Sequence, residues 1–194
     1  KELKKPGSSK ALINNMDQGG LLKEELDFLR NAKYDKQLEA QVKSWIESVS
    51  GKTINGTFAE GLKDGVVLCF FMQALSPGSI PRIQESSQVF KQMENIKHFL
   101  KALRSKFKFA ENEVFSTLDL CEEKDLNQVL QAMCTLHRKV SEDSSLSHFT
   151  DGYDLVVRDM SGEVAKAEKE LARRRKEKAE QSNKKKTTPA PAPA

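Results

Sequence analysis

An apolar decapeptide is the feature that most limits how this chain can fold. Residues 66–75 read VVLCFFMQAL, follow a charged segment that contains glycine, and are closed by Pro77-Gly78. The run is far shorter than the roughly 20 apolar residues of a membrane-spanning helix, and it contains Gln73. On a helix its apolar side chains cover every side, so other elements must surround it. We therefore predict a buried central helix that ends where Pro77-Gly78 turns the chain.

Three further stretches have the apolar periodicity of amphipathic helices and can supply that surround. The first is followed by Gly51, a typical residue just past a helix end, and the second is preceded by Ser87, a suitable cap. The third follows a group of carboxylates, which suits the positive end of the helix dipole. The sequence thus predicts an all-α fold, a compact bundle of four main helices plus short helices. The three apolar stripes are Leu38, Val42, Trp45 and Val49; Phe90, Met93, Ile96, Leu100 and Leu103; and Leu126, Val129, Leu130, Met133, Leu136 and Val140.

The chain organisation follows from where these patterns stop. Charged residues make up 31% of the 194 residues, which indicates one domain with solvated ends. We predict a disordered N-terminus (1–20), a short helix that docks on the domain (21–33), the helical domain (34–140), an acidic spacer (141–163) and a basic tail, partly helical and partly disordered (164–194).

The two C-terminal segments differ sharply in charge. Residues 141–163 carry one Arg against six Asp or Glu, whereas residues 164–194 carry ten Lys or Arg against four Glu. Residues 163–181 are rich in helix formers but lack the repeated heptads of a coiled coil, which predicts a solvated helix. The closing KKKTTPAPAPA is typical of an extended, disordered end.

The sequence contains no recognisable catalytic or metal-binding motif. His98, His137 and His148 share no metal-ligand spacing, and we expect surface histidines. The tetrapeptide SGKT at 50–53 resembles the end of a phosphate-binding loop, but it lacks the preceding glycine and follows a predicted helix rather than a strand. We therefore predict a non-enzymatic binding protein without metal or cofactor.

The cysteines and the net charge indicate the cellular compartment and the class of partner. Cys69, Cys121 and Cys134 are odd in number and lack CxxC spacing, so buried free thiols in a reducing compartment are expected. No signal peptide is visible, which together with the thiols predicts a cytoplasmic protein. The missing initiator Met is typical of a trimmed or partial chain. The net charge of +4 is too small to indicate nucleic-acid binding.

Four segments resemble a calponin-homology domain of the single-domain kind found in calponins and transgelins. They are YDKQLEAQVKSWIESVSG (34–51), FAEGLKDGVVLCFFMQALSPGSIPRI (58–83), VFKQMENIKHFL (89–100) and VFSTLDLCEEKDLNQVLQAM (114–133). The resemblance covers residues 34–140 without a long gap. The calponin-type repeat that follows the domain in that family is not recognisable in FTDGYDLVVRDMSGEV.

The resemblance implies a monomeric cytoskeletal protein with F-actin and other cytoskeletal proteins as partners. Such a protein binds actin filaments, and bundles or stabilises them, without membrane insertion or nucleic acid. Two alternatives stay open: a protein–protein adaptor or scaffold, and a microtubule-binding member of the same family.

Because F-actin has an acidic surface, basic residues are the candidate contacts. The resemblance places contacts on the first helix, at Lys36 and Lys43, and on the last helix, at Gln128, Gln131 and Thr135. For the basic residues of the tail and of the run around Leu103, the alternative is a merely solvated surface. The tail candidates are Arg173, Arg174, Arg175, Lys176, Lys178, Lys184, Lys185 and Lys186, and the run comprises Lys97, Lys101, Arg104, Lys106 and Lys108.

Overall fold

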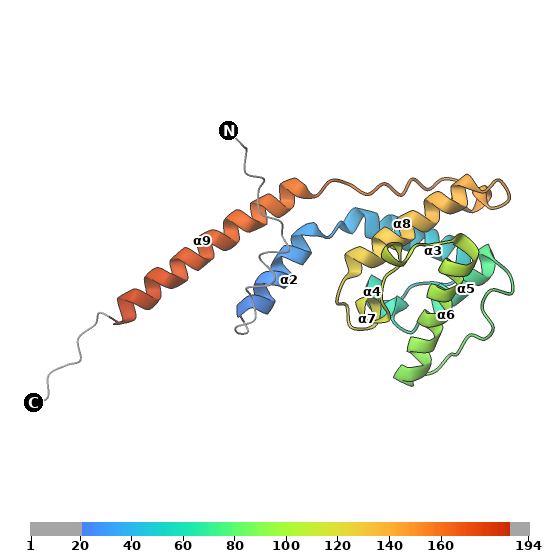
Figure 1. Ribbon diagram of the computed structural model, residues 1–194, viewed down its shortest axis with the longest axis horizontal. Coiled ribbons are helices and arrows are strands. Elements are labelled where there is room, and N and C mark those ends of the chain that lie inside the picture. Colours follow the sequence, from blue (N-terminus) through green and yellow to red (C-terminus); the bar gives the residue numbers. More distant parts are fainter. Residues whose placement is uncertain (1–20, 187–194) are drawn as a thin grey trace, which may run out of the picture. The chain divides into compact units, whose positions relative to one another are not determined.

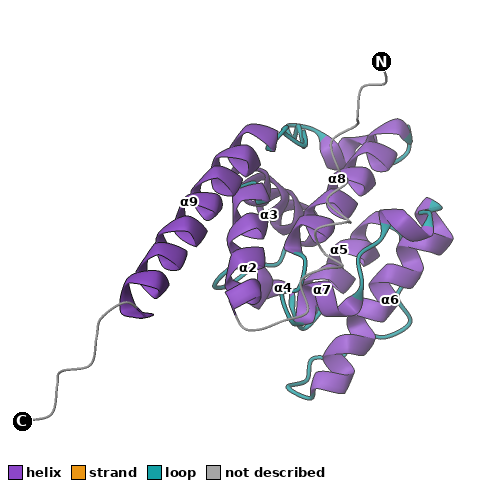
Figure 2. Ribbon diagram, turned by 60° about the vertical axis from the view of Figure 1, so that its left-hand side comes forward, coloured by secondary structure: helices purple, strands orange, loops and turns teal. Residues whose placement is uncertain are grey.

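The computed structural model describes residues 21–186, and over that range it contains α- and 3-10 helices and no strand (Figures 1 and 2). The all-α prediction is confirmed. Residues 1–20 and 187–194, for which disorder is predicted, lie outside the described part of the chain. The helices are α2 (Leu21–Lys33), α3 (Lys36–Ser50), α4 (Phe58–Leu62), α5 (Val66–Leu75), α6 (Val89–Phe107), η1 (Glu111–Glu113), α7 (Thr117–Cys121), α8 (Leu126–Glu142), η2 (Ser147–Thr150) and α9 (Ser161–Lys186).

Residues 34–159 form one compact unit, which contains the predicted helical domain; α2 and α9 belong to a second unit. Within the described range no helix has the length and hydrophobicity needed to cross a membrane.

Helix α3 begins and ends at residues whose chemistry suits those positions. The Asp35 carboxylate caps the N-terminus by accepting the main-chain N–H groups of Gln37 (2.9 Å) and Leu38 (3.0 Å). Gly51 ends the helix with a φ of 64°, and its N–H donates to the Glu47 carbonyl at 2.9 Å. This left-handed conformation favours glycine. The predicted helix end at Gly51 is confirmed.

Helix α5 is the centre of the core, as the apolar decapeptide predicts. Every residue of α5 is either buried or half-buried, because α3 and α6 pack on either side of the helix. The fully buried Trp45 of α3 meets Phe71 edge-to-face with ring centroids 4.9 Å apart. Two of the three thiols, on α5 and α8, are buried and free. The buried residues of α5 are Val67, Leu68, Cys69, Phe71, Met72 and Leu75.

A buried asparagine fixes the start of α5 against α6. Asn95 is 0% exposed, and its Nδ2 donates to the carbonyls of Asp64 and Gln84, each at 2.9 Å. Its Oδ1 accepts the Gln84 N–H at 3.0 Å, so the whole amide is paired. Cys69 Sγ donates to the Asn95 carbonyl at 3.4 Å. Because an unpaired buried amide is costly, this satisfied network specifies how the two helices meet.

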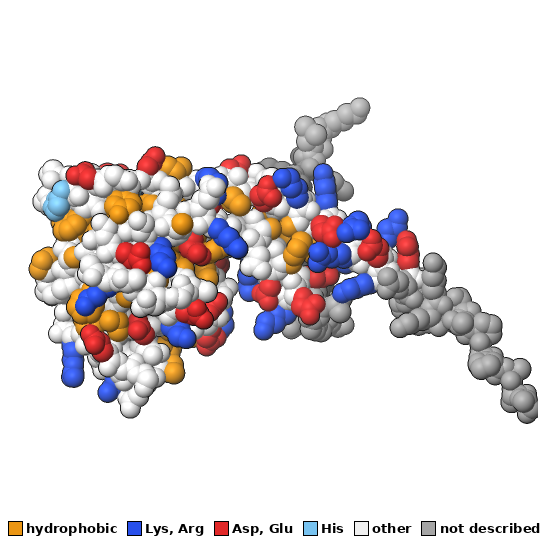
Figure 3. All heavy atoms as spheres, turned by 180° about the vertical axis from the view of Figure 1, so that it is seen from behind, with side chains coloured by type: hydrophobic (Ala, Val, Ile, Leu, Met, Phe, Trp, Pro, Cys, Tyr) orange, Lys and Arg blue, Asp and Glu red, His pale blue; other side chains and the backbone are white. Residues whose placement is uncertain are grey.

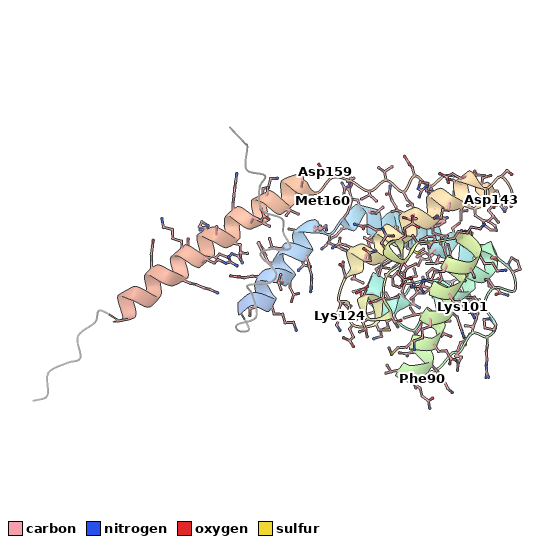
Figure 4. All side chains as sticks on the ribbon, viewed as in Figure 1. Phe90, Lys101, Lys124, Asp143, Asp159 and Met160 are labelled. Carbon is pink, nitrogen blue, oxygen red and sulfur yellow. The ribbon has the colours of Figure 1, made fainter. Side chains whose placement is uncertain are left out.

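Helix α6 buries one side only, and the predicted stripe is wrong at its first member. Ile96, Leu100 and Leu103 are buried, but Phe90 is 73% exposed. Figure 4 shows Phe90 at the beginning of α6. At about 100° per residue Phe90 lies roughly opposite the centre of the buried stripe, so a periodic spacing alone misplaces it.

Residues 143–159, which we call the C-terminal strap, return over the domain instead of leaving it at residue 140. Trp45 Nε1 donates to the Phe149 carbonyl at 2.8 Å, and Tyr153 Oη donates to the Ser44 carbonyl at 3.3 Å. Thr150 and Leu155 of the strap are buried. The strap therefore belongs to the compact unit, which extends past the predicted boundary.

The strap ends in a charged clamp on the start of α3. Arg158 Nε donates to Asp35 Oδ2 at 2.6 Å, its Nη2 donates to Asp35 Oδ1, and its Nη1 donates to Gln37 Oε1 at 2.7 Å. Asp35 is 5% exposed. The Arg158 guanidinium holds the pKa of the Asp35 carboxyl down to about 2. One carboxylate thus caps α3 and anchors the end of the strap.

The second unit pairs α2 with α9. The apolar stripe of α9 is short, but Ala167 and Leu171 are buried in it. Docking of residues 21–33 on the helical domain stays a prediction; within its own unit α2 has α9 as its partner. The predicted solvated tail helix likewise gains a partner.

Candidate functional site

The exposed side of α6 gathers basic residues on one face of a rigid helix. Phe90, Lys97, Lys101 and Arg104 fall within an arc of about 60° at roughly 100° per residue, opposite the buried stripe. All four are exposed. Figure 4 labels Phe90 and Lys101 on this helix. We call Lys97, Lys101 and Arg104 the α6 basic face.

Not every residue of the predicted basic run shares this face. Arg104 Nη2 pairs with Glu111 Oε1 at 3.0 Å, whereas Lys97 and Lys101 form no ion pair with any described residue. Lys106 is exposed but lies on another side of the last turn. Lys108 is the cap residue just past the helix, with a φ of 52°. The structure thus reduces the run to two unpaired lysines with a paired arginine beside them.

The first-helix candidates lie beside the C-terminal strap. Lys36 is exposed and Lys43 half-buried, and their chain neighbours Gln37 and Ser44 are among the residues that the strap contacts. The strap carries exposed acidic residues, Asp151 and Asp154 among them. This acidic segment reduces the positive potential near α3, so α3 is a weaker candidate than α6 for an acidic partner.

Two of the three last-helix candidates have structural contacts within the domain. Gln128 Nε2 donates to the carbonyls of Asn112 and Val114, each at 3.3 Å, so its side-chain amide holds the segment before α7. Thr135 is half-buried, and Gln131 is exposed.

The tail arginines lie in a lattice of opposite charges (Figure 3). Arg173 binds Glu170 at 2.8 Å and Glu177 at 3.0 Å, and Arg174 shares Glu170 at 2.9 Å. The two guanidinium groups hold the pKa of the Glu170 carboxyl down to about 2. Arg175 reaches α2, where its Nη2 lies 2.5 Å from Glu25 Oε2. All three predicted contacts therefore have counter-ions within their own unit.

The α2–α9 pair is further held by an aromatic contact. The guanidinium carbon of Arg174 lies 4.7 Å from the ring centroid of Phe28. Lys176 and Lys178 are exposed, and neither forms an ion pair with a described residue. Lys184, Lys185 and Lys186 lie in the last turns of α9, but their side chains are outside the described part of the structure.

The histidines are not all on the surface, contrary to the prediction. His137 is half-buried and packs edge-on against Trp45 with ring centroids 5.0 Å apart. Burial lowers its pKa. His98 is also half-buried, and His148 is exposed. Over residues 21–186, no group of three or more His, Cys, Asp or Glu side chains is placed to hold a metal ion.

Comparison with known proteins decides the family. A model of the calponin homology (CH) domain matches residues 36–142, which is more than half of the chain. The chain belongs to the calponin homology family. The resemblance seen in the sequence is thereby confirmed, and residues 36–142 are the CH domain, which the C-terminal strap follows.

Calponin-2 proteins are among the similar relatives. Calponin-2 of Mus musculus is 42% identical over 108 residues, and that of Homo sapiens is 40% identical over 108 residues. Each alignment covers 56% of this chain and 35% of the relative, so the match spans about a third of the calponin-2 length. The whole strap and all of α9 lie outside the residues that the family model matches.

Solved structures agree on the fold. The calponin-homology domain of an IQGAP protein from Schizosaccharomyces pombe gives a TM-score of 0.50 at 24% identity and covers 76% of this chain and 89% of that one. The calponin-homology domain of RNG2 from the same organism gives 0.51 at 22% identity with the same coverage. These likenesses support the fold alone.

Two features of the surface are missed by reasoning from the sequence. A helical wheel of residues 89–107 shows that Phe90 is far from the centre of the buried stripe, so the sequence itself indicates that Phe90 is exposed. The Arg158–Asp35 clamp joins residues 123 positions apart, and no local pattern points to it.

Proposed function

We propose that this protein is a non-enzymatic cytoskeletal protein that binds actin filaments through the α6 basic face of its CH domain. The observation that carries the proposal is the pair Lys97 and Lys101, exposed on a rigid helix without a counter-ion among the described residues. An acidic filament surface supplies that counter-charge. The family relationship supports the choice of filament.

The tail plays a secondary part in this proposal. Lys176 and Lys178 leave α9 with positive charge beyond its internal pairs, and this charge attracts an acidic filament at long range. The ion pairs of Arg173 to Arg175 must open before those side chains can contact a partner. The domain therefore makes the main contact, and α9 adds a weaker one.

Bundling follows if the two contacts engage different filaments. A single domain binds one filament, and a second contact on the same chain acts at a high effective concentration. We propose that α9 is this second contact. Low-speed centrifugation separates bundles from single filaments, and Lys176→Glu with Lys178→Glu is expected to abolish bundling while high-speed pelleting continues.

Cosedimentation of the full chain with F-actin tests the main contact. The variant carrying Lys97→Glu and Lys101→Glu is compared with one carrying Lys36→Glu and Lys106→Glu, which changes the net charge equally. Only the first is expected to weaken binding, by about tenfold at roughly 50 mM salt and by less at roughly 200 mM salt, because exposed charges are screened.

Three results would refute the proposal. They are no pelleting of the wild-type chain at low salt, equal losses in the two charge variants, and pelleting with tubulin but not with actin. The last result would favour the microtubule-binding alternative. Recovery of one stoichiometric partner other than actin would favour the adaptor alternative.

A further inference from the structure

Phe90 is the most exposed large hydrophobic side chain among the described residues. It is 73% exposed, and its neighbour Val89 is 65% exposed. The other large hydrophobic residues with exposed side chains, Leu118, Val156 and Val157, are 36%, 56% and 53% exposed. Both side chains stand in water at the start of α6, but successive residues are about 100° apart around a helix, so they point to different sides of it. An aromatic side chain left in water is unfavourable for the isolated protein.

Local helix chemistry does not explain these two residues. A hydrophobic staple would pair the residue before the N-cap with the fourth helical residue. In α6 the N-cap is Gln88, and the two staple positions are Ser87 and Gln92, both polar. Phe90 is therefore not part of a capping contact, and Phe has no advantage in helix propensity at an exposed position.

Phe90 precedes the α6 basic face along the helix, and the half-buried Glu94, whose carboxylate accepts from Gln84 Nε2, lies between them. Phe90 falls on the same side of α6 as Lys97 and Lys101, seven and eleven residues further along. At about 1.5 Å per residue the aromatic ring precedes the two lysines by roughly 10 and 16 Å along the axis. An aromatic side chain at one end and unpaired positive charge at the other form one surface with two kinds of chemistry.

We infer that Phe90 is the apolar anchor of the filament contact, an inference that rests on the proposed function. The partner surface then carries an apolar pocket about 10–16 Å from an acidic patch. Buried aromatic residues near the centre of an interface usually contribute most of its affinity, whereas exposed charges set the salt dependence. The anchor and the lysines therefore have separable effects.

Cosedimentation of the full chain at two salt concentrations separates them. Phe90→Ala is expected to weaken filament binding by about tenfold or more, by the same factor at low and at high salt. Lys101→Ala is expected to weaken it mainly at low salt. Phe90→Leu should recover part of the affinity. The matched control is Val156→Ala, which removes an exposed apolar side chain from the strap and should leave binding unchanged.

The fold of these variants is secure because the side chains are solvent-exposed, and far-ultraviolet circular dichroism with thermal unfolding checks it. Wild-type pelleting with an unchanged Phe90→Ala variant overturns the inference and leaves the proposed function standing. A loss confined to low salt also overturns it. Absence of wild-type pelleting refutes the proposed function and the inference together. A wild-type dimer that Phe90→Ala dissociates assigns Phe90 to a contact with a second copy and overturns the filament anchor.

Discussion

Replacement of Gly65 by alanine tests the packing at the centre of the CH domain. Gly65 precedes α5 with a φ of 69°, a left-handed conformation. A Cβ atom there would lie 2.7 Å from Asn95 Cβ, 2.8 Å from the Ile96 main-chain nitrogen and 2.9 Å from Ile96 Cγ1. Two of these atoms are fixed by the backbone of α6, so relief of the overlap requires α5 and α6 to separate.

The expected loss of stability has two parts. The left-handed conformation costs an alanine about 1 kcal/mol, and the overlap costs about 1–3 kcal/mol more, as for other overpacked cores. Gly65→Ala should therefore lower the free energy of unfolding by about 2–4 kcal/mol. Gly51 has a similar φ of 64°, but a Cβ atom added there would have no neighbouring atom within 4 Å, so Gly51→Ala should lose about 1 kcal/mol.

Urea unfolding measures this difference, because the single Trp of the chain, Trp45, is fully buried against Phe71 and reports on the core. In thermal unfolding, 1 kcal/mol corresponds to a shift of roughly 3–6 °C for a domain of this size. Equal losses for the Gly65 and Gly51 variants would refute the close approach of α5 to α6. A smaller loss for Gly65→Ala than for Gly51→Ala would refute it more directly.

Three other expectations concern titration, helix pairing and thiol chemistry. Because the pKa of Asp35 is lowered to about 2, its ion pair with Arg158 stabilises the fold fully above about pH 4, and this stability declines as the pH falls through about 2; Asp35→Asn should lower the free energy of unfolding by about 1–2 kcal/mol at pH 7 and by much less at pH 2, and a deficit of equal size at the two pH values would contradict this. Glu25→Gln removes the charge that binds Arg175 and should speed amide exchange in α2 about two- to fivefold, whereas unchanged exchange would show that the pair does not stabilise α2. Cys121 is partly exposed, so a thiol reagent should modify it first in the native protein and reach the two buried thiols after unfolding; simultaneous reaction of all three would contradict the core.

The sequence predicts those parts of the fold that local chemistry determines. The run VVLCFFMQAL can be satisfied only by burial, and it is buried. The end of α3 follows from Gly51, which adopts the left-handed conformation there. These features depend on side chains close together in the chain. The periodic pattern fails at Phe90, because it counts apolar residues at helical spacing without asking where the buried side is centred.

Contacts between residues far apart in the sequence cannot be predicted from such local patterns. The strap reads as an acidic spacer, yet Arg158 binds Asp35 and the Phe149 carbonyl accepts from Trp45. Similarly, α9 has too short an apolar stripe to predict a partner, and its pairing with α2 includes a long-range ion pair of Arg175 with Glu25. Such long-range ion pairs leave no periodic pattern in the sequence. Many other pairs of opposite charges in the chain could form equally well, so the sequence does not indicate which pair forms.

The distribution of counter-ions explains why a strongly basic tail is not the first choice for the filament contact. Every Lys or Arg adds equally to the net charge of the tail. A side chain that already forms an ion pair, however, must give up that partner before it can bind an acidic group of a filament. For exposed pairs such as Arg173 with Glu170 that exchange costs little, since each pair contributes about 0–1 kcal/mol. The tail can therefore follow a filament once it is near, and at long range its net charge speeds the encounter. In the contact proposed above, residence on the filament depends instead on groups that gain a partner without losing one. Lys97 and Lys101 meet that condition on a helix that the core holds rigid.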